Sequence, residues 1–151
     1  MSSVDLASLS GLDLMRWLQA KGFDDIPSVG RLLGMNYDEV EKGRIAISIE
    51  TQPEFANPMG IVHGGIISTL LDSVMGCAVH TCLPVGTSYA TLELKVNFIR
   101  ATLVTGRKLT GEGTVIHLGR RTATAEGKVH DEEGKLVAHA TTTCIILDGS
   151  S

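Results

Sequence analysis

The segment from Gly64 to Thr81 constrains the fold of this chain more than any other. Its apolar residues recur around most of the circumference of a helix, which predicts a helix buried on nearly every side. These residues are Ile66, Ile67, Leu70, Leu71, Val74, Met75, Ala78 and Val79. A helix of this kind needs other elements packed around it, and the rest of the chain must supply them.

Most of the remaining chain has the pattern of β-strands. In one segment Ile45, Ile47 and Ile49 alternate with smaller or polar residues, as in a half-buried strand. The predicted extended segments cover residues 29–37, 43–51, 88–100, 107–117, 121–130 and 136–147. The residues Asp131–Gly134 predict a hairpin turn, and we expect most of the strands to follow the helix as a meander. The fold class is therefore α+β, with a curved antiparallel sheet wrapped around a long central helix.

A short additional helix is predicted near the N-terminus. Ser10 and Asp13 have the spacing of a capping box, and Gly22 is placed to end the helix. Its apolar side could pack on the core or cover a pocket. We therefore divide the chain into a helical extension, residues 1–27, and a main domain, residues 28–148.

The composition excludes several classes of protein. The chain has 151 residues, 43% of them hydrophobic, which predicts one globular domain. Its net charge of −4 argues against the basic face of a nucleic-acid binder. No apolar run reaches the ~20 residues that a membrane helix needs, and no secretory signal is evident. The three cysteines suggest no disulfide framework, and the histidines have no zinc spacing. We expect a cytoplasmic protein without a bound metal.

Asp72 is the one carboxylate of the central helix. It lies on a stripe of small or polar residues, Thr69, Asp72, Ser73, Gly76 and His80, which leaves room for a ligand or a second helix. Burying an unpaired carboxylate costs several kcal/mol. Asp72 therefore either takes part in chemistry or forms hydrogen bonds across a helix or subunit contact.

The start of the same helix is a second candidate region. Asn57 precedes it, and His63, Gly64 and Gly65 form its entrance. The free N–H groups of a helix N-terminus can hold the negative oxygen that develops on an attacked acyl carbonyl. The alternatives are a tight loop-to-helix turn at the two glycines and a structural, hydrogen-bonded role for His63.

The spacing between these two regions predicts a dimer if both are catalytic. Asp72 is eight residues beyond Gly64, about 12 Å along one helix at 1.5 Å per residue. The two residues of one chain cannot flank the same reacting carbon. Antiparallel helices of two subunits would instead form two equivalent sites across a two-fold interface.

These residues resemble the motif of a known family. The run Asn57-x-x-Gly60-x-x-His63-Gly64-Gly65, followed by Asp72, is similar to that of the hot-dog-fold acyl-CoA thioesterases of the PaaI type. This family comprises the phenylacetic acid degradation thioesterases and their THEM-type relatives. The resemblance covers about residues 29–147, and residues 91–98 look like the strand that spans the family's dimer.

The resemblance implies hydrolysis of an acyl-CoA to a free acid and CoA. Asp72 would act as general base on a water or as nucleophile through an anhydride, and both routes stay open. The N–H of Gly64, with or without that of Gly65, would bind the thioester oxygen. No cofactor is implied, because CoA is part of the substrate.

The remaining site residues are also carried over from the resemblance. Asn57 would orient the water or the carbonyl, His63 would shape the entrance, and Thr91 would help to hold the water. The dimer would pair further into a tetramer.

The resemblance also implies a place for the CoA nucleotide. Gly119, Arg120 and Arg121 look like the family's turn near the nucleotide, and arginine suits phosphate. Arg100 and Lys108 are further candidates. The alternative is an ordinary basic hairpin turn.

Three other functions compete with the thioesterase. Hot-dog folds also include hydroxyacyl-CoA dehydratases, and a non-catalytic acyl-CoA binding protein is a second alternative. The third is a cysteine hydrolase that uses Cys77 or Cys82 with His80. The acyl group could be a small aryl or a medium-chain alkyl group.

Overall fold

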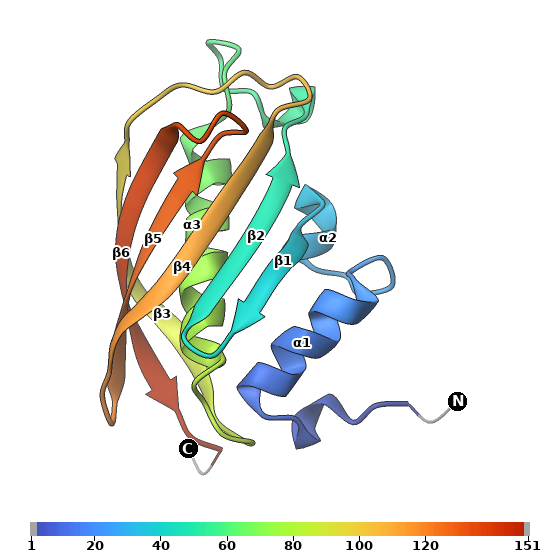
Figure 1. Cartoon of the computed structure of the whole chain (residues 1–151), viewed down its shortest axis with the longest axis vertical. Coiled ribbons are helices and arrows are strands. Elements are labelled where there is room, and N and C mark those ends of the chain that lie inside the picture. The colour runs from blue at the N-terminus through green and yellow to red at the C-terminus, as the bar shows by residue number, and fades with distance from the viewer. Residues whose placement is uncertain (1–2, 150–151) are drawn as a thin grey trace.

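The computed structural model describes residues 3–149, in which an antiparallel sheet of six strands wraps around one long helix (Figure 1). The helices are α1 (Gly11–Lys21), α2 (Val29–Leu33) and α3 (Gly64–His80), with 3-10 turns η1 (Leu6–Ser8) and η2 (Pro53–Phe55). The strands are β1 (Asn36–Glu41), β2 (Arg44–Glu50), β3 (Ser88–Phe98), β4 (Lys108–Leu118), β5 (Thr122–His130) and β6 (Leu136–Leu147). The predicted fold class is confirmed.

The central helix α3 is the predicted one and ends one residue earlier, with Thr81 as its C-cap. Its side chains Leu70, Leu71, Val74 and Met75 are completely buried. Glycines on the strands allow the sheet to approach the helix closely. A Cβ on Gly113 would clash with the carbonyl oxygen of Val74, so only glycine fits at this point of β4.

The order of the strands is β1-β2-β4-β5-β6-β3. The hairpins from β4 to β6 form a meander, with Asp131–Gly134 as the predicted turn between β5 and β6. The predicted meander is found in β4 to β6, and β3 stands outside it. It pairs with β6 at the far edge of the sheet, in a register that runs from Ser88 opposite Leu147 to Phe98 opposite Ala138.

The predicted extended segment 29–37 was wrong over its first half. Residues Val29–Leu33 form the helix α2, and strand β1 begins only at Asn36. Ser28 caps this helix by accepting a hydrogen bond from the N–H of Arg31, and Gly34 ends it with a left-handed backbone at φ 65°. These caps stabilise a single helical turn that is too short to have a helical period.

The N-terminal helix α1 packs on the core at the β1 side of the sheet (Figure 1). Ser10 is its N-cap as predicted, since the N–H of Asp13 donates to Oγ of Ser10 at 3.2 Å and that hydroxyl donates to Oδ2 of Asp13 at 2.8 Å. Met15 is buried in the same cluster as the α3 side chains. The division of the chain at residues 27 and 28 stays a prediction. Within residues 3–149, none of the helices is long and apolar enough to cross a membrane.

Candidate active site

Two of the predicted catalytic residues meet at the middle of α3. The hydroxyl of Thr91, on the edge strand β3, donates a hydrogen bond to Oδ1 of Asp72 at 2.7 Å. Asp72 itself is half-buried, and Thr91 is exposed in the single chain. The carboxylate thus has one fixed partner and an accessible side.

The stripe of small and polar residues around Asp72 faces strand β3. A Cβ on Gly76 would clash with the Tyr89 ring, and that ring also contacts His80 edge-on at 5.7 Å between centroids. The room expected at Gly76 for a ligand or a second helix is therefore filled by Tyr89. Thr69, one turn before Asp72, donates its hydroxyl to the carbonyl of Gly65 at 2.8 Å.

The N-terminus of α3 leaves one of the two predicted glycine amides available. His63 is the N-cap, and its Nδ1 accepts a hydrogen bond from the N–H of Gly65 at 2.8 Å. The N–H of Gly64 has no hydrogen-bond partner among residues 3–149. In this geometry the N–H of Gly64 is free, and His63 orders the turn by engaging the N–H of Gly65.

Asn57 lies in the loop before α3 and has a split role in hydrogen bonding. Its Oδ1 accepts from the N–H groups of Met59 at 3.0 Å and Ile61 at 3.2 Å, which fixes the side chain. In the described part of the chain its Nδ2 has no partner, so two donors stay available to a ligand.

Asn57 and Gly64 line a common pocket of about 310 Å³. Phe98, Ile67 and the predicted phosphate ligand Arg100 also line it. The Phe98 ring stands directly over Gly64, because a Cβ there would lie 3.0 Å from Cζ of the ring. Asp72 does not line this pocket. Within one chain the candidate residues therefore form two separate groups, one around Asp72 and one at the start of α3.

The predicted nucleotide-binding residues Gly119, Arg120 and Arg121 form the turn between β4 and β5, where the N–H of Gly119 donates to the carbonyl of Thr122 at 2.8 Å. This turn lies at the end of the sheet away from the start of α3 (Figure 1). Arg120 and Arg121 are exposed and line an open pocket of about 570 Å³ with Ile145 and Leu147. Within one chain they are not brought together with Asn57 and Gly64.

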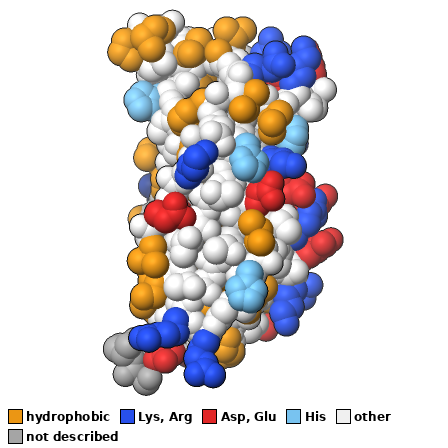
Figure 2. All heavy atoms as spheres, turned by 90° about the vertical axis from the view of Figure 1, so that its left-hand side faces the viewer, with side chains coloured by type: hydrophobic (Ala, Val, Ile, Leu, Met, Phe, Trp, Pro, Cys, Tyr) orange, Lys and Arg blue, Asp and Glu red, His pale blue; other side chains and the backbone are white. Residues whose placement is uncertain are grey.

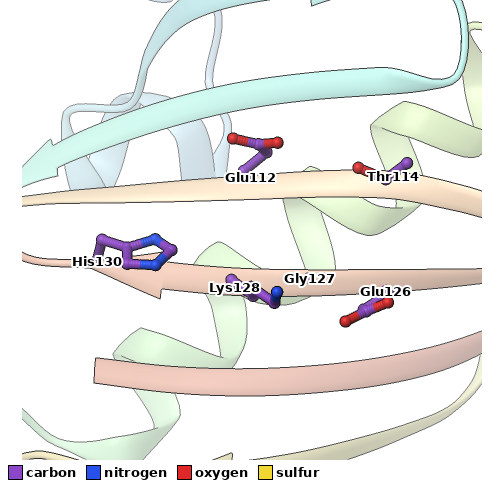
Figure 3. Close-up of a pocket in the computed structure, with 6 residues that line it drawn as sticks. All are labelled: Glu112, Thr114, Glu126, Gly127, Lys128 and His130. Carbon is purple, nitrogen blue, oxygen red and sulfur yellow. The ribbon is translucent and has the colours of Figure 1, made fainter. Parts of the chain in front are cut away.

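The outer face of the sheet has a polar groove that the sequence did not indicate. Glu112, Glu126, Lys128 and His130 on β4 and β5 line it (Figure 3). His139 of β6 contacts Oε1 of Glu126 through Nε2 at 3.0 Å. On the side that Figure 2 shows, charges of both signs are scattered among uncharged side chains. This groove contains none of the predicted site residues.

The surroundings of Cys77 and Cys144 do not favour a cysteine nucleophile, and the Sγ of Cys82 contacts the carbonyl oxygen of Ala78 at 3.8 Å. Burial raises the pKa of the Cys77 thiol to about 11, and its Sγ lies 3.2 Å from the hydroxyl of Tyr37. Burial also raises the pKa of Cys144 and lowers that of His80. A catalytic cysteine needs a thiolate near neutral pH, and these surroundings disfavour one.

The sheet wrapped around α3 defines a hot-dog fold, and comparison with known proteins identifies the family. The model of the thioesterase superfamily matches residues 59–138, more than half of the chain. The chain belongs to this superfamily, so the predicted hot-dog thioesterase of the PaaI type and the predicted class of thioester hydrolase are confirmed.

Individual relatives agree with this assignment. A candidate esterase of Saccharolobus solfataricus is 32% identical over 125 residues, which cover 83% of this chain and 87% of the relative. The medium/long-chain acyl-CoA thioesterase YigI of Escherichia coli is 27% identical over 131 residues, covering 77% of this chain and 83% of YigI. A solved phenylacetic acid degradation-related protein of Ralstonia eutropha superposes with a TM-score of 0.77 at 30% identity, covering 91% and 99% of the two chains.

Proposed function

We propose that this protein is an acyl-CoA thioesterase that works as a homodimer with two shared active sites. The hydrogen bond between Thr91 and Asp72 carries the proposal, because it holds the carboxylate in place while leaving it accessible. The free N–H of Gly64 and the free Nδ2 of Asn57 supply the complementary half. Each site combines Asp72 of one subunit with Asn57 and Gly64 of its partner.

The chemistry follows from these groups. The Gly64 N–H, at the positive end of a 17-residue helix, stabilises the oxygen of the thioester as it becomes negative. Asp72 takes a proton from the attacking water or attacks the carbonyl itself, and CoA leaves as the thiol. Thr91 orients the carboxylate, and Asn57 donates to the water or the carbonyl.

Strand β3 supports the dimer. Its 11 residues form one edge of the sheet, and in the described part of the chain no strand pairs with its outer side. Leu92 and Phe98 on it are 58% and 56% exposed. A long edge with exposed apolar residues is a site for pairing with a second copy. Two such dimers then form the tetramer.

The same two-fold symmetry brings the CoA ligands into position. A partner helix antiparallel to α3 also reverses the partner's sheet. The β4–β5 turn of one subunit, with Gly119, Arg120 and Arg121, then lies at the same end as Asn57 and Arg100 of the other. We assign these arginines to the phosphates of CoA.

The acyl group is a small aryl or a medium-chain group. The names of the relatives support both, because one acts on medium and long acyl chains and another is related to phenylacetic acid degradation. The apolar residues of the pocket at Gly64, including Ile67 and Phe98, suit either kind. A dehydratase is disfavoured, because Nδ1 of His63 engages a backbone amide rather than an acid.

The test is release of thiol from a panel of aryl- and alkyl-CoA substrates by wild type, Asp72→Asn and Asp25→Asn. Asp25 is an exposed acid on the N-terminal side and serves as the matched control. We expect Asp72→Asn to lower kcat by a factor of about 100 or more, with an unchanged fold and an unaffected control. Near-normal turnover by Asp72→Asn would overturn the assignment. Binding of intact acyl-CoA without thiol release would indicate the non-catalytic acyl-CoA binding protein.

A further inference from the structure

A β-bulge in strand β3 lies directly beside Asp72. Thr91 is opposite Cys144 on β6 and Glu93 is opposite Thr143, so Leu92 is an extra residue without a partner position. An extra residue reverses the alternation of side chains along a strand. The bulge is therefore the point at which the inward face of β3 changes from odd-numbered to even-numbered residues.

This change is what allows Thr91 to face the helix. Before the bulge, Tyr89 and Thr91 face α3; after it, Leu94 and Val96 pack on the core. In a regular strand without the extra residue, odd-numbered and even-numbered side chains lie on opposite faces. If Leu94 and Val96 then faced the core, Thr91 would point away from Asp72. The hydrogen bond from Thr91 to Asp72 thus depends on the bulge staying at this place.

One buried side chain holds the bulge. The hydroxyl of Thr142, on the neighbouring strand β6, donates to the carbonyl oxygen of Glu93 at 2.7 Å. Thr142 is 2% exposed, and its side chain is on the face of β6 that is turned towards α3. A bulge removes regular ladder bonds, and the threonine hydroxyl satisfies the carbonyl at that point.

We propose that Thr142 is a positioning residue for the active site, although it touches no reacting atom. It fixes the carbonyl of Glu93, and hence the bulge, and the bulge directs Thr91 onto Asp72. The proposal rests on the proposed function, in which Asp72 is the catalytic carboxylate. Under this proposal Thr142 affects turnover by positioning Thr91, in addition to any contribution to stability.

The experiment compares three substitutions of Thr142 with one control. Thr142→Val and Thr142→Ala remove the hydroxyl, whereas Thr142→Ser keeps it. Thr51→Val is the matched control, because Thr51 is 3% exposed and its hydroxyl accepts the N–H of Arg107 at 2.9 Å. That hydroxyl lies away from β3, so its loss affects stability without affecting the bulge.

We expect Thr142→Val and Thr142→Ala to lower kcat about 10-fold with KM changed less than about twofold, because the chemical step rather than binding is affected. Thr142→Ser retains kcat within about twofold of wild type, and so does Thr51→Val. Equal turnover by the alanine and serine variants would overturn the proposal. The serine-to-alanine comparison holds even if the valine variant fails to fold, because both lose the same methyl group.

A double-mutant cycle with Thr91→Val decides whether the effect runs through Thr91. If it does, adding Thr142→Val to Thr91→Val lowers kcat no further. Independent, multiplying losses would contradict the proposal. Asp72→Asn, measured in parallel, distinguishes failure of the proposed function from failure of the role of Thr142. Full activity of Asp72→Asn refutes the proposed function. Loss of activity in Asp72→Asn, together with equal kcat values for Thr142→Ala and Thr142→Ser, refutes only the role of Thr142.

Discussion

The two edges of the sheet are built in opposite ways. Strand β1 has six residues with a bulge between Tyr37 and Glu39, and helix α1 packs on it. Arg44 joins β2 to its neighbours by ion pairs to Glu39 and Glu112. Strand β3 has 11 residues, exposed leucine and phenylalanine side chains, and Thr91 next to the candidate carboxylate. Covered edges prevent association and open ones permit it, so the comparison assigns stability to one edge and function to the other.

The strongest test of this division places a charge on each edge in turn. Leu92→Asp puts a carboxylate into the proposed β3 interface, and we expect the dissociation constant of the dimer to rise about 100-fold or more, since an uncompensated buried charge costs about 3–5 kcal/mol. Light scattering over a range of protein concentrations measures it. We expect turnover to fall with the dimer, because each proposed site combines residues of two subunits.

The matched control is Leu32→Asp, on helix α2 beside the covered edge, where the leucine is 75% exposed. It leaves both the oligomeric state and the turnover as in wild type. Leu92 is also the extra residue of the bulge beside Thr91, so the oligomeric state and not turnover decides the outcome. A Leu92→Asp protein that stays dimeric at low concentration would contradict the role of β3.

The covered edge should contribute stability without contributing to turnover. Met15 of α1 is 5% exposed and joins that edge to the core, so Met15→Ala lowers the free energy of unfolding by about 2–4 kcal/mol. We expect kcat to stay within about twofold of wild type at temperatures where the variant is folded. Urea denaturation measures the change, with the 74% exposed Met59 as control in Met59→Ala. A comparable loss of unfolding free energy in Met59→Ala, or a loss of turnover in folded Met15→Ala, would contradict the assignment of stability to one edge and function to the other.

The smallest expected effect concerns the contact between the covered edge and α3 at alkaline pH. The pKa of Cys77 is about 11 in the folded protein against an ordinary 9.0, because burial disfavours the thiolate. The unfolded chain therefore releases this proton first, and the free energy of unfolding falls by about 2 kcal/mol between about pH 9 and 11.

Cys77→Ala removes this contribution and leaves that of Tyr37 and Tyr89, whose pKa values are also raised by burial. Denaturation curves of wild type and variant at pH 8, 9, 10 and 11 measure the difference. The wild type should lose more stability than the variant over this range. Parallel curves would show that Cys77 titrates normally.

The sequence predicted the parts of the fold that have a long regular pattern. Helix α3 and strands β4 to β6 have bounds within one or two residues of those predicted, because the periodicity of a long element is local information. The helix α2 was missed because one turn has no period. The position of β3 beside β6 was missed because strand pairing is decided between distant segments.

The residues of the candidate site were named from the sequence, whereas their hydrogen bonds were not. Asn57, Gly64 and Asp72 followed from spacing and resemblance. That His63 engages the N–H of Gly65 and leaves Gly64 free depends on the backbone at the helix cap. The bulge leaves a sign in the sequence, because the residues of β3 expected to face inward change from odd numbers (Tyr89 and Thr91) to even numbers (Leu94 and Val96). The hydrogen bond from Thr142 to this bulge can be seen only in the three-dimensional structure.

The close approach of Gly113 to Val74 has a consequence for how this protein could be redesigned or could evolve. Helix α3 rests directly on the backbone of β4 at Gly113, with no side chain between the two that could be shortened to deepen a cavity. New acyl groups must therefore be accommodated on the opposite side, through substitutions in β3 and in the loop before α3. The β4 side of α3 is therefore fixed by the main chain, whereas the side that faces β3 and the preceding loop can be changed by substituting side chains.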